Sequence, residues 1–343
     1  MTGGAPLIDT LGRALRTLRL SVTDRCNLRC HYCMPEPEYA WLPRDLLLRF
    51  EEATRLVRVL TGLGVRAVRL TGGEPLLRHG LPDLVASLAA QPLADLALTT
   101  NGLLLERLAE PLKRAGLKRL TVSLDTLAAD RFRALTGQGG LSRVVGGIRA
   151  AARCFGGVKI DAVILRGVND DELADLLEFG AEVGAEVRFI EYMDVAGATR
   201  WTADAVVPSS EMIGRVRARY GSAEPIEEPD SAAPATRFAL PDGRTFGIVA
   251  STTSPFCRAC DRVRLTADGT LYMCLYGTEG LALRDPMRSG ATDEALAGLV
   301  AARWRARADR GAEERASLPV RRAYLPLRTL RADPRLEMHS RGG

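Results

Sequence analysis

Short apolar runs alternate along the first 190 residues with longer segments in which apolar positions recur every three or four residues. The short runs predict strands and the longer segments predict amphipathic helices. In Glu51–Leu63, for example, Ala53, Leu56 and Leu60 lie on one apolar stripe. The strands are expected at Leu18–Val22, Ala67–Leu70, Ala94–Thr100, Lys118–Leu124, Val158–Leu165 and Ala185–Ile190.

The predicted helices lie between the predicted strands. Two further ones are expected over Leu103–Ala115 and Asp170–Val183, and Asn169-Asp170-Asp171 offers a cap for the second. Strands separated by helices imply a parallel sheet built from βα units. Six such units in about 180 residues fit an open, partial (β/α)6 TIM-like barrel better than a complete eightfold one. We therefore expect an α/β fold with its active site at the carboxyl ends of the strands.

The pattern changes after about residue 193. Residues 195–235 are rich in Ala, Pro and Glu and predict a connecting region with one helix near Ser210–Tyr220. Thr236–Ala250 alternates around Pro241-Asp242-Gly243, which predicts a hairpin, and Asp268-Gly269 predicts another turn. The last forty residues are rich in arginine and weakly apolar, as is typical of a solvated or frayed tail. The predicted division is a barrel over residues 1–194 and a C-terminal α+β extension over residues 195–343.

The composition is that of a globular enzyme, with 46% hydrophobic and 26% charged residues among 343. No run approaches ~20 apolar residues, and the N-terminus does not resemble a signal peptide. We therefore expect a cytoplasmic protein, in which clustered cysteines are metal ligands rather than disulfides. The net charge of +5 comes almost entirely from arginine. No aromatic residues interleave a basic stripe, so nucleic-acid binding is not indicated.

Six of the seven cysteines form two triplets. An iron–sulfur cube usually takes four Cys ligands, so three thiolates leave one iron free to bind a small molecule. Zinc is the alternative, although structural zinc usually has four ligands in two spaced pairs. For the second triplet His339 offers a fourth zinc ligand, and the spacing alone favours neither metal. The triplets are Cys26-x₃-Cys30-x₂-Cys33 and Cys257-x₂-Cys260-x₁₃-Cys274. The seventh, Cys154, lies in an apolar helical stretch that predicts core packing.

The first triplet follows the first predicted strand and has Tyr32 directly before its last cysteine. This stretch resembles the CxxxCxxC signature of the radical S-adenosylmethionine (SAM) superfamily. The resemblance implies a 4Fe–4S cluster whose open iron binds SAM, and one-electron cleavage of SAM to methionine and a 5′-deoxyadenosyl radical. Thr71-Gly72-Gly73-Glu74-Pro75 resembles the superfamily's GGEP motif, which binds the amino group of SAM. By the same resemblance Tyr32, Gly73, Ser123 and Met193 would hold SAM.

Arg262 and Arg264 come directly after Cys260 and point to the same side if the segment is extended. Two guanidiniums beside an incomplete cluster suit a polyphosphate. With the lead-in at residues 18–24 and the terminal Gly-Gly, this arrangement resembles the MoaA family, the GTP 3′,8-cyclases of molybdenum cofactor biosynthesis, over nearly the full length. The resemblance implies a second 4Fe–4S cluster, on Cys257, Cys260 and Cys274, that binds guanine. It also implies a GTP site lined by Arg19, Arg69, Thr99, Lys159, Arg262, Val263 and Arg264.

Charges on barrel strands need either a structural ion pair or an anion, because burying them unpaired is costly. The resemblance further implies that Gly342 and Gly343 reach the active site and are needed for catalysis. Arg341 stands where the family usually has an apolar residue, and Asp261 where we would expect Asn.

The expected partners follow from the same resemblance. They are GTP as substrate, an electron donor, and cyclic pyranopterin monophosphate synthase as consumer of the product. No nucleic acid or membrane is expected to bind, and the chain would be a monomer or homodimer. Two alternatives stay open: another radical SAM enzyme with an auxiliary cluster, such as a peptide-modifying one, and a zinc-dependent nucleic-acid-binding protein.

Overall fold

A single curved sheet carries the fold in the computed structural model, which describes residues 6–227 and 232–342. Its strand order is β12-β11-β10-β1-β2-β3-β4-β5-β6-β9-β8-β7. The strands from β10 to β9 are parallel to one another, and antiparallel strands continue the sheet on both sides. The strands are β1 (Thr17–Ser21), β2 (Ala67–Thr71), β3 (Asp95–Thr100), β4 (Arg119–Ser123), β5 (Val158–Ile164), β6 (Ala185–Glu191), β7 (Glu224–Ile226), β8 (Thr236–Ala239), β9 (Thr245–Val249), β10 (Arg262–Leu265), β11 (Thr270–Tyr272) and β12 (Leu281–Ala282).

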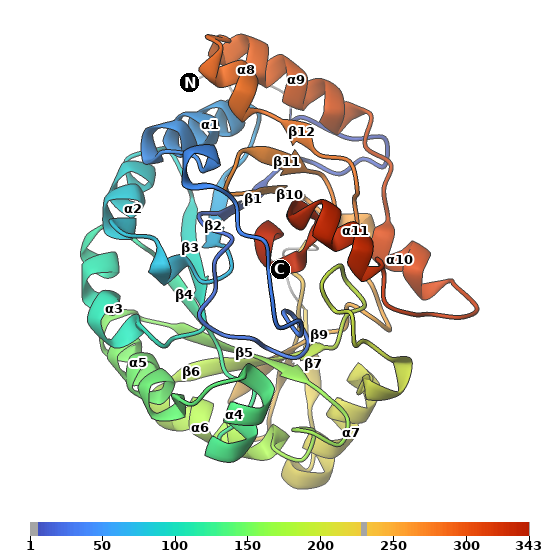
Figure 1. Ribbon diagram of the computed structural model, residues 1–343. Helices are drawn as coiled ribbons and strands as arrows, with labels where there is room; N and C mark the ends of the chain where they lie inside the picture. The colour runs from blue at the N-terminus through green and yellow to red at the C-terminus, as the bar shows by residue number, and fades with distance from the viewer. Residues whose placement is uncertain (1–5, 228–231, 343) are drawn as a thin grey trace.

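The helices are α1 (Phe50–Gly62), α2 (Leu81–Ala89), α3 (Leu105–Arg114), α4 (Ala129–Thr136), α5 (Leu141–Cys154), α6 (Leu173–Val183), α7 (Ser209–Tyr220), α8 (Arg284–Arg288), α9 (Asp293–Arg305), α10 (Gly311–Ala316) and α11 (Leu327–Ala332). Most of them form a ring around the outside of the sheet, whereas α11 and the C-terminal end lie near the centre of the ring (Figure 1). In the part of the chain that the structure describes, no helix combines the length and apolarity that crossing a bilayer requires.

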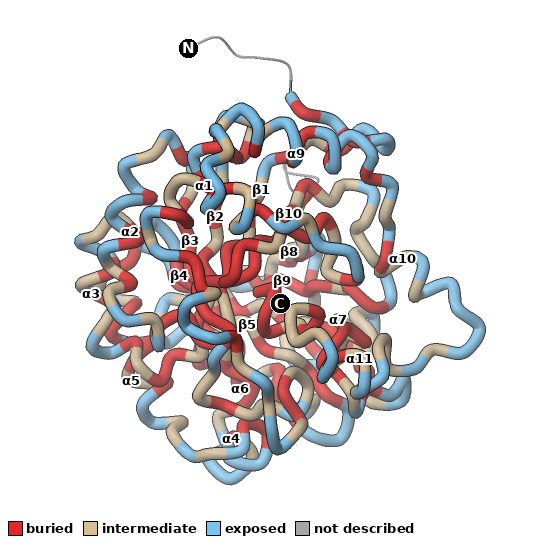
Figure 2. The backbone as a smooth tube through the Cα atoms, turned by 45° about the horizontal axis from the view of Figure 1, so that its top comes forward, coloured by how far each residue is buried: buried red, intermediate tan, exposed pale blue. Residues whose placement is uncertain are grey.

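Alternation along the strands separates the core from the polar interior of the barrel. In β5 every second residue, beginning with Val158, is buried, whereas Lys159 and Asp161 between them are partly exposed. The buried positions belong to the main hydrophobic core beneath the helices, and Figure 2 shows the buried chain concentrated in the strands and exposed chain on the outer ring. The strands therefore present polar and charged side chains to the interior.

The predicted partial barrel is confirmed, with each of its six predicted strands present within two residues of the expected ends. The hairpin around Pro241-Asp242-Gly243 joins β8 and β9, with the amide of Leu240 bonded to the carbonyl of Arg244 at 2.8 Å. The turn at Asp268-Gly269 joins β10 and β11. Cys154, as predicted, lies at the end of α5 against the core.

The predicted helix cap at Asn169-Asp170-Asp171 is wrong. Helix α6 begins at Leu173, and Glu172 precedes it. The Asn169 side chain is fully buried and instead accepts from the Leu165 amide at 2.8 Å and donates to the carbonyls of Asp125 and Val163. Its amide thus joins the ends of β4 and β5, where three backbone groups saturate it.

The C-terminal residues are not a separate layer. Strand β10 pairs with β1 and β9 pairs with β6, so both lengthen the sheet of the barrel. The expected frayed tail is also wrong: a 3₁₀ turn over Met338–Arg341 is followed by Gly342, and His339, Ser340 and Arg341 are buried. The division at residue 194 stays a prediction, and one sheet runs across it.

Candidate functional site

A cavity of about 210 Å³ lies at the carboxyl ends of the parallel strands. Parallel strands of a barrel end at one face, so residues distant in sequence converge there. The cavity brings together the three cysteines of the first triplet and the four residues predicted to bind SAM. Its lining includes Cys26, Cys30, Cys33, Tyr32, Gly73, Ser123 and Met193, together with Thr99 from the predicted GTP set and Met338 and His339 from the tail.

Glycines shape the wall of this cavity. The amides of Cys33 and Met34 both bond to the carbonyl of Cys30, which coils the loop after β1. A Cβ atom on Gly73 would lie 2.4 Å from the carbonyl oxygen of Arg25, and one on Gly72 would lie 2.4 Å from that of Thr23. Only glycine therefore lets the end of β2 pack against the cysteine loop.

The chemistry of the first triplet fits a metal centre. Burial raises the pKa of Cys26 to about 11 and raises the pKa values of Cys30 and Cys33, whose neighbouring acidic groups and thiols add to the shift. Thiolates in such surroundings require a nearby positive charge. A cluster of iron ions bound by these cysteines would supply that charge and would replace the thiol protons.

Two buried carboxylates support the site: Glu74, which belongs to the predicted GGEP motif, and Asp125, which the sequence analysis did not single out. Glu74 accepts from the Leu76 amide at 2.9 Å, the Thr100 hydroxyl at 2.7 Å and the Asn101 amide at 2.7 Å, and burial raises its pKa to about 7. It therefore joins the ends of β2 and β3.

Asp125 orients the aromatic residue of the cysteine loop. It accepts from the Tyr32 hydroxyl at 2.7 Å and from the Val163 amide at 2.8 Å, and burial raises its pKa to about 6. Its position just after a predicted strand was the signal that could have indicated it.

Three arginines lie abreast on adjacent strands: Arg264 on β10, Arg19 on β1 and Arg69 on β2. Burial and the neighbouring guanidiniums lower the pKa of Arg19, with Arg264 the strongest of these neighbours. Arg69 donates to the hydroxyls of Thr99 at 3.0 Å and Thr121 at 3.1 Å. Arg19 and Arg264 each donate to the carbonyl oxygen of Gly342 at 2.8 Å. We call Arg264, Arg19 and Arg69 the arginine row.

The arginine row connects the two cysteine triplets. At one end, Arg264 interacts electrostatically with Cys260 and Cys274. At the other, Arg69 bonds to Thr99, which lines the cavity of the first triplet. The barrel thus places a strip of positive charge between two sets of thiols.

The remaining predicted GTP residues occupy different surroundings. Lys159 forms an ion pair with Glu186 at 2.8 Å, so its charge has a structural partner. Arg262 stacks over the Phe256 ring at 5.0 Å and donates to the Ala232 carbonyl. Val263 alternates with these arginines, and its side chain lies in the hydrophobic core. The Val263 side chain therefore does not line the barrel interior, and its place in the GTP site stays a prediction.

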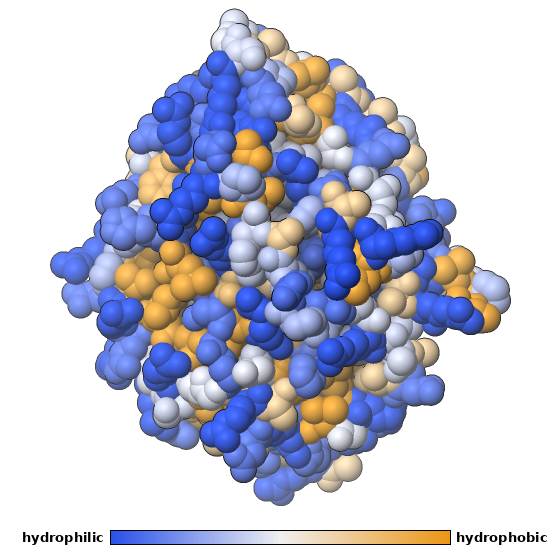
Figure 3. All heavy atoms as spheres, in the orientation of Figure 1, coloured by the Kyte–Doolittle hydropathy of each residue, from blue (hydrophilic) through white to orange (hydrophobic). Residues whose placement is uncertain are grey.

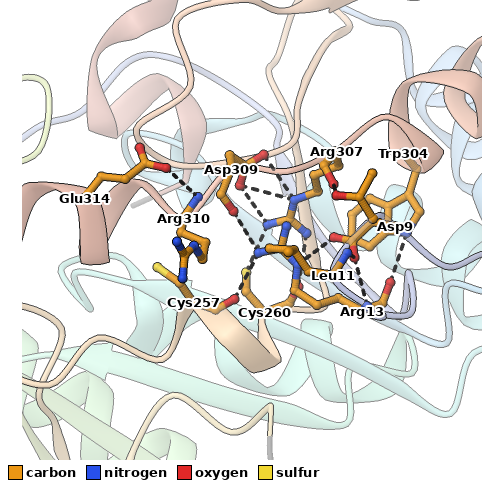
Figure 4. A network of polar contacts seen from close by, with 11 residues as sticks. Asp9, Leu11, Arg13, Cys257, Cys260, Trp304, Arg307, Asp309, Arg310 and Glu314 are labelled. Atoms are coloured by element: carbon orange, nitrogen blue, oxygen red, sulfur yellow. Dashed lines mark hydrogen bonds and ion pairs between the residues drawn. The ribbon is translucent and has the colours of Figure 1, made fainter.

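The second triplet lies at the start and end of the β10–β11 hairpin. Cys257 begins a 3₁₀ turn, Cys260 precedes β10 and Cys274 follows β11. Burial raises the pKa of Cys274 to about 11. Burial also acts to raise the pKa of Cys260, but the guanidiniums of Arg307 and Arg262 outweigh it, so this pKa is lowered. Figure 4 shows the arginines around Cys257 and Cys260.

His339, which the zinc interpretation offered as a fourth ligand of the second triplet, lies at the first triplet instead. It lines the cavity of the first triplet and packs edge-on against the rings of Tyr39 and Trp41. Among the residues described, no three His, Cys, Asp or Glu side chains gather around a position for one metal ion.

The C-terminal tail is held by its last side chain. Arg341 is 1% exposed, lies 4.0 Å above the Tyr272 ring, and donates to the carbonyls of Arg335, Leu275 and Gly277 at 2.6–2.9 Å. Gly342 has φ +66°, and a Cβ there would lie 1.9 Å from the Thr71 hydroxyl. Gly343 lies outside the described residues.

Comparisons with known proteins agree with this geometry. Residues 20–180 match the family model of the radical SAM superfamily, and residues 185–313 match that named Molybdenum Cofactor Synthesis C. The chain is 53% identical to GTP 3′,8-cyclase 1 of Mycobacterium tuberculosis H37Rv, over 98% of this chain and 95% of that one. It is 48% identical to GTP 3′,8-cyclase of Acidothermus cellulolyticus, over 91% and 89%. Among solved structures, Streptococcus suis SuiB bound to S-adenosylmethionine has a TM-score of 0.59 at 16% identity, covering 84% of this chain and 68% of that one, which shows a shared fold.

Proposed function

Because this chain belongs to the GTP 3′,8-cyclase family of radical SAM enzymes, we propose that its two cysteine triplets hold two 4Fe–4S clusters on either side of one GTP site. The protein is a GTP 3′,8-cyclase of molybdenum cofactor biosynthesis. Its superfamily implies one 4Fe–4S cluster and SAM. The second cluster and the roles of individual residues are our proposal.

The observation that supports a single GTP site is the arginine row between the triplets. Guanidiniums make charge-assisted hydrogen bonds with phosphate oxygens, worth roughly 1.5–3 kcal/mol each. Arg69 and Arg264 now donate to hydroxyls and carbonyls, which are neutral. A triphosphate would bring negative charge to these two guanidiniums, which are costly to desolvate without it.

The cavity residues bind and orient SAM beside Cys26, Cys30 and Cys33. The cluster and SAM, when bound, supply the radical chemistry of the reaction. Gly73 and Ser123 bring backbone and hydroxyl groups to the cavity wall, and Tyr32 is fixed by Asp125. Met193 also lines the cavity. With SAM and GTP bound, the filled site would exclude water from the reacting groups.

The remaining predicted residues bind GTP. Thr99 faces the cavity beside Arg69, which places a hydroxyl between the two binding regions. Lys159 contributes by releasing Glu186 and binding a phosphate oxygen in its place. Arg262 contributes a further guanidinium next to the arginine row. Holding the ribose and the guanine in one orientation favours the bond between C3′ and C8, which gives 3′,8-cyclo-7,8-dihydro-GTP.

The tail is part of this proposal. Gly342 contacts two members of the arginine row, so the tail closes the GTP site, and Gly342 with Gly343 participates in catalysis. The external electron donor, the consuming synthase, the cytoplasmic location, the monomeric or dimeric state and the absence of nucleic-acid or membrane partners stay predictions.

Anaerobic turnover tests the proposal. The reconstituted full chain is incubated with SAM, a reductant and GTP, and the products are identified by mass spectrometry. We expect 5′-deoxyadenosine and a cyclised nucleotide in equal amounts, and roughly eight irons per chain, the content of two four-iron cubes. Deoxyadenosine without a nucleotide product would favour the peptide-modifying alternative. Two zincs without iron would favour the nucleic-acid-binding one.

A further inference from the structure

A network of buried arginines beside the second triplet has no role in binding GTP as proposed above. Arg307 follows α9, and its side chain is 1% exposed. It donates to the carbonyl oxygen of Cys260 at 3.0 Å and to the sulfur of Cys260 at 3.4 Å. Figure 4 shows its guanidinium between Asp309 and this cysteine. A buried cation is therefore aimed at one specific sulfur of the triplet.

The position of Arg307 is fixed from several sides. The Asp309 carboxylate accepts from Arg307 at 3.2 Å, and the Trp304 ring lies 4.6 Å from the guanidinium carbon. Such a group holds one orientation without help from a ligand, so its donor is pre-organised toward Cys260.

A second buried arginine braces the same loop from the N-terminal end of the chain. Arg13 donates to the carbonyl of Cys257 at 3.0 Å and to that of Asp309 at 2.8 Å, and it forms an ion pair with Asp9 at 2.6 Å. Its Nη2 atom is buried without a hydrogen-bond partner. Buried donors normally have an acceptor, so this orphaned group fits a site in which the cysteine loop carries a sulfur-rich, negatively charged centre.

The three cysteines differ in what surrounds them. Cys257 is contacted by backbone amides of Ala312 and Glu313, at the start of α10. Cys274 lies close to Gly311, where a Cβ would come within 3.2 Å of its sulfur. Of the side-chain hydrogen bonds that the structure shows at this triplet, the one from Arg307 to Cys260 comes from a charged group.

We propose that Arg307 is a positioning residue that raises the reduction potential of the metal centre on the second triplet, by donating a charged hydrogen bond to the Cys260 sulfur. This inference depends on the proposed second 4Fe–4S cluster. Reduction adds one negative charge to a cluster, and hydrogen bonds to its sulfurs stabilise the more negative form. Arg307 thereby makes the second cluster easier to reduce than its cysteines alone would.

The test measures potential rather than turnover. In the full chain, Cys26, Cys30 and Cys33 are changed to Ser so that only the second cluster is observed. Its midpoint potential is then measured by an anaerobic redox titration followed by electron paramagnetic resonance, with Arg307 or with Arg307→Gln. We expect Arg307→Gln to lower the equilibrium constant for one-electron reduction of the cluster about tenfold. This corresponds to a midpoint potential that is lower by about 59 mV. Arg307→Lys keeps the charge and should recover part of this shift.

Arg305→Gln is the matched control. Arg305 is exposed and lies two residues before Arg307, so the substitution removes the same charge without touching Cys260. Its midpoint should equal that of the parent. If Arg307→Gln binds too little iron to be titrated, Arg307→Lys takes its place. The midpoint potential of Arg307→Lys must then be lower than that of Arg305→Gln. An unchanged midpoint in an iron-loaded Arg307 variant overturns the inference while leaving the second cluster intact. A parent protein that binds no iron overturns the second cluster itself, and with it the inference.

Discussion

Single arginines carry most of the functional geometry of this protein. Those of the row lie on strands of the barrel, where an anion would offset the cost of burying their charge. Arg341 and Arg307 are buried more fully than Arg19 and Arg69. Arg341 contacts carbonyls and the Tyr272 ring, and Arg307 contacts Asp309 and the Cys260 sulfur. The same residue type therefore lines the proposed GTP site at one place, holds the tail at a second and contacts a cysteine at a third. The surroundings of each arginine decide which of these roles it has.

Arg264→Ala should lower the affinity for GTP about tenfold or more while SAM cleavage continues, because one charge-assisted contact with the triphosphate is lost. Arg262→Ala should act in the same direction. Anaerobic binding titrations measure the affinity, and 5′-deoxyadenosine release measures SAM cleavage. Arg258→Ala is the control, since Arg258 is exposed and close in sequence. Unchanged GTP affinity in both variants would remove these arginines from the site.

Arg341→Met should release the tail, because it leaves three carbonyls without their donor and weakens docking by about 2–4 kcal/mol. We expect cyclisation to fall at least tenfold with the iron content unchanged, and a carboxypeptidase to remove the last residues faster. Arg331→Met, on an exposed residue of α11, should do neither. Full turnover by Arg341→Met would show that the tail needs no anchor.

Helices from both ends of the chain are joined on the outside of the barrel. Glu52 on α1 binds Arg288 on α8 at 2.8 Å, and Asp293 on α9 binds Arg55 on α1 at 2.7 Å. The face of the molecule in Figure 3, seen as in Figure 1, is largely hydrophilic with separate apolar patches, and the exposed Leu318 and Val320 follow α10. These helices are therefore held together by ion pairs and by the packing beneath them. In the described part of the chain, one large apolar interface at the surface is not involved.

Glu52→Gln should destabilise the protein by about 1–2 kcal/mol at pH 7, an amount reduced because Arg288 is partly exposed. Hydrogen bonds from Arg288 lower the pKa of Glu52 to about 2 from an ordinary 4.5. An acid with a lowered pKa in the folded state stabilises it above about pH 4.5 and loses this contribution as the pH falls toward 2.

Urea unfolding at several pH values measures how the contribution of Glu52 to the free energy of unfolding depends on pH. The difference between wild type and Glu52→Gln should be full at pH 7 and shrink below pH 4.5. Glu51→Gln, one residue away and exposed, should show no such difference. A difference that stays constant down to pH 3 would contradict the ion pair.

One sheet runs across the predicted division at residue 194, so we expect the two predicted parts to depend on each other for stability. β10 covers one edge of β1 and β9 covers one edge of β6. Removing them would expose unpaired backbone groups along both strands, together with the core that Val263 and Leu265 fill.

A fragment of residues 1–194 should therefore be insoluble or lack a cooperative unfolding transition, as measured by circular dichroism during thermal unfolding. The matched control is a chain lacking only Gly342 and Gly343, which loses no strand and should fold like the full chain. Its cyclisation should nevertheless be abolished. A soluble 1–194 fragment that unfolds cooperatively would show that the barrel is an autonomous domain.

The amino-acid sequence determined the strands, the helices, the partial barrel and the family, because periodicity, turn residues and cysteine spacing are local patterns. It did not reveal the surroundings of Asn169, Val263, His339 or Arg307. The contacts of Asn169 depend on where two strands end, and those of His339 on where the tail docks. Pairing of β10 with β1 joins residues about 245 positions apart, and it aligns Arg264 with Arg19. Such long-range contacts leave no local signal, so only the folded chain defines the arginine row and the cation beside Cys260.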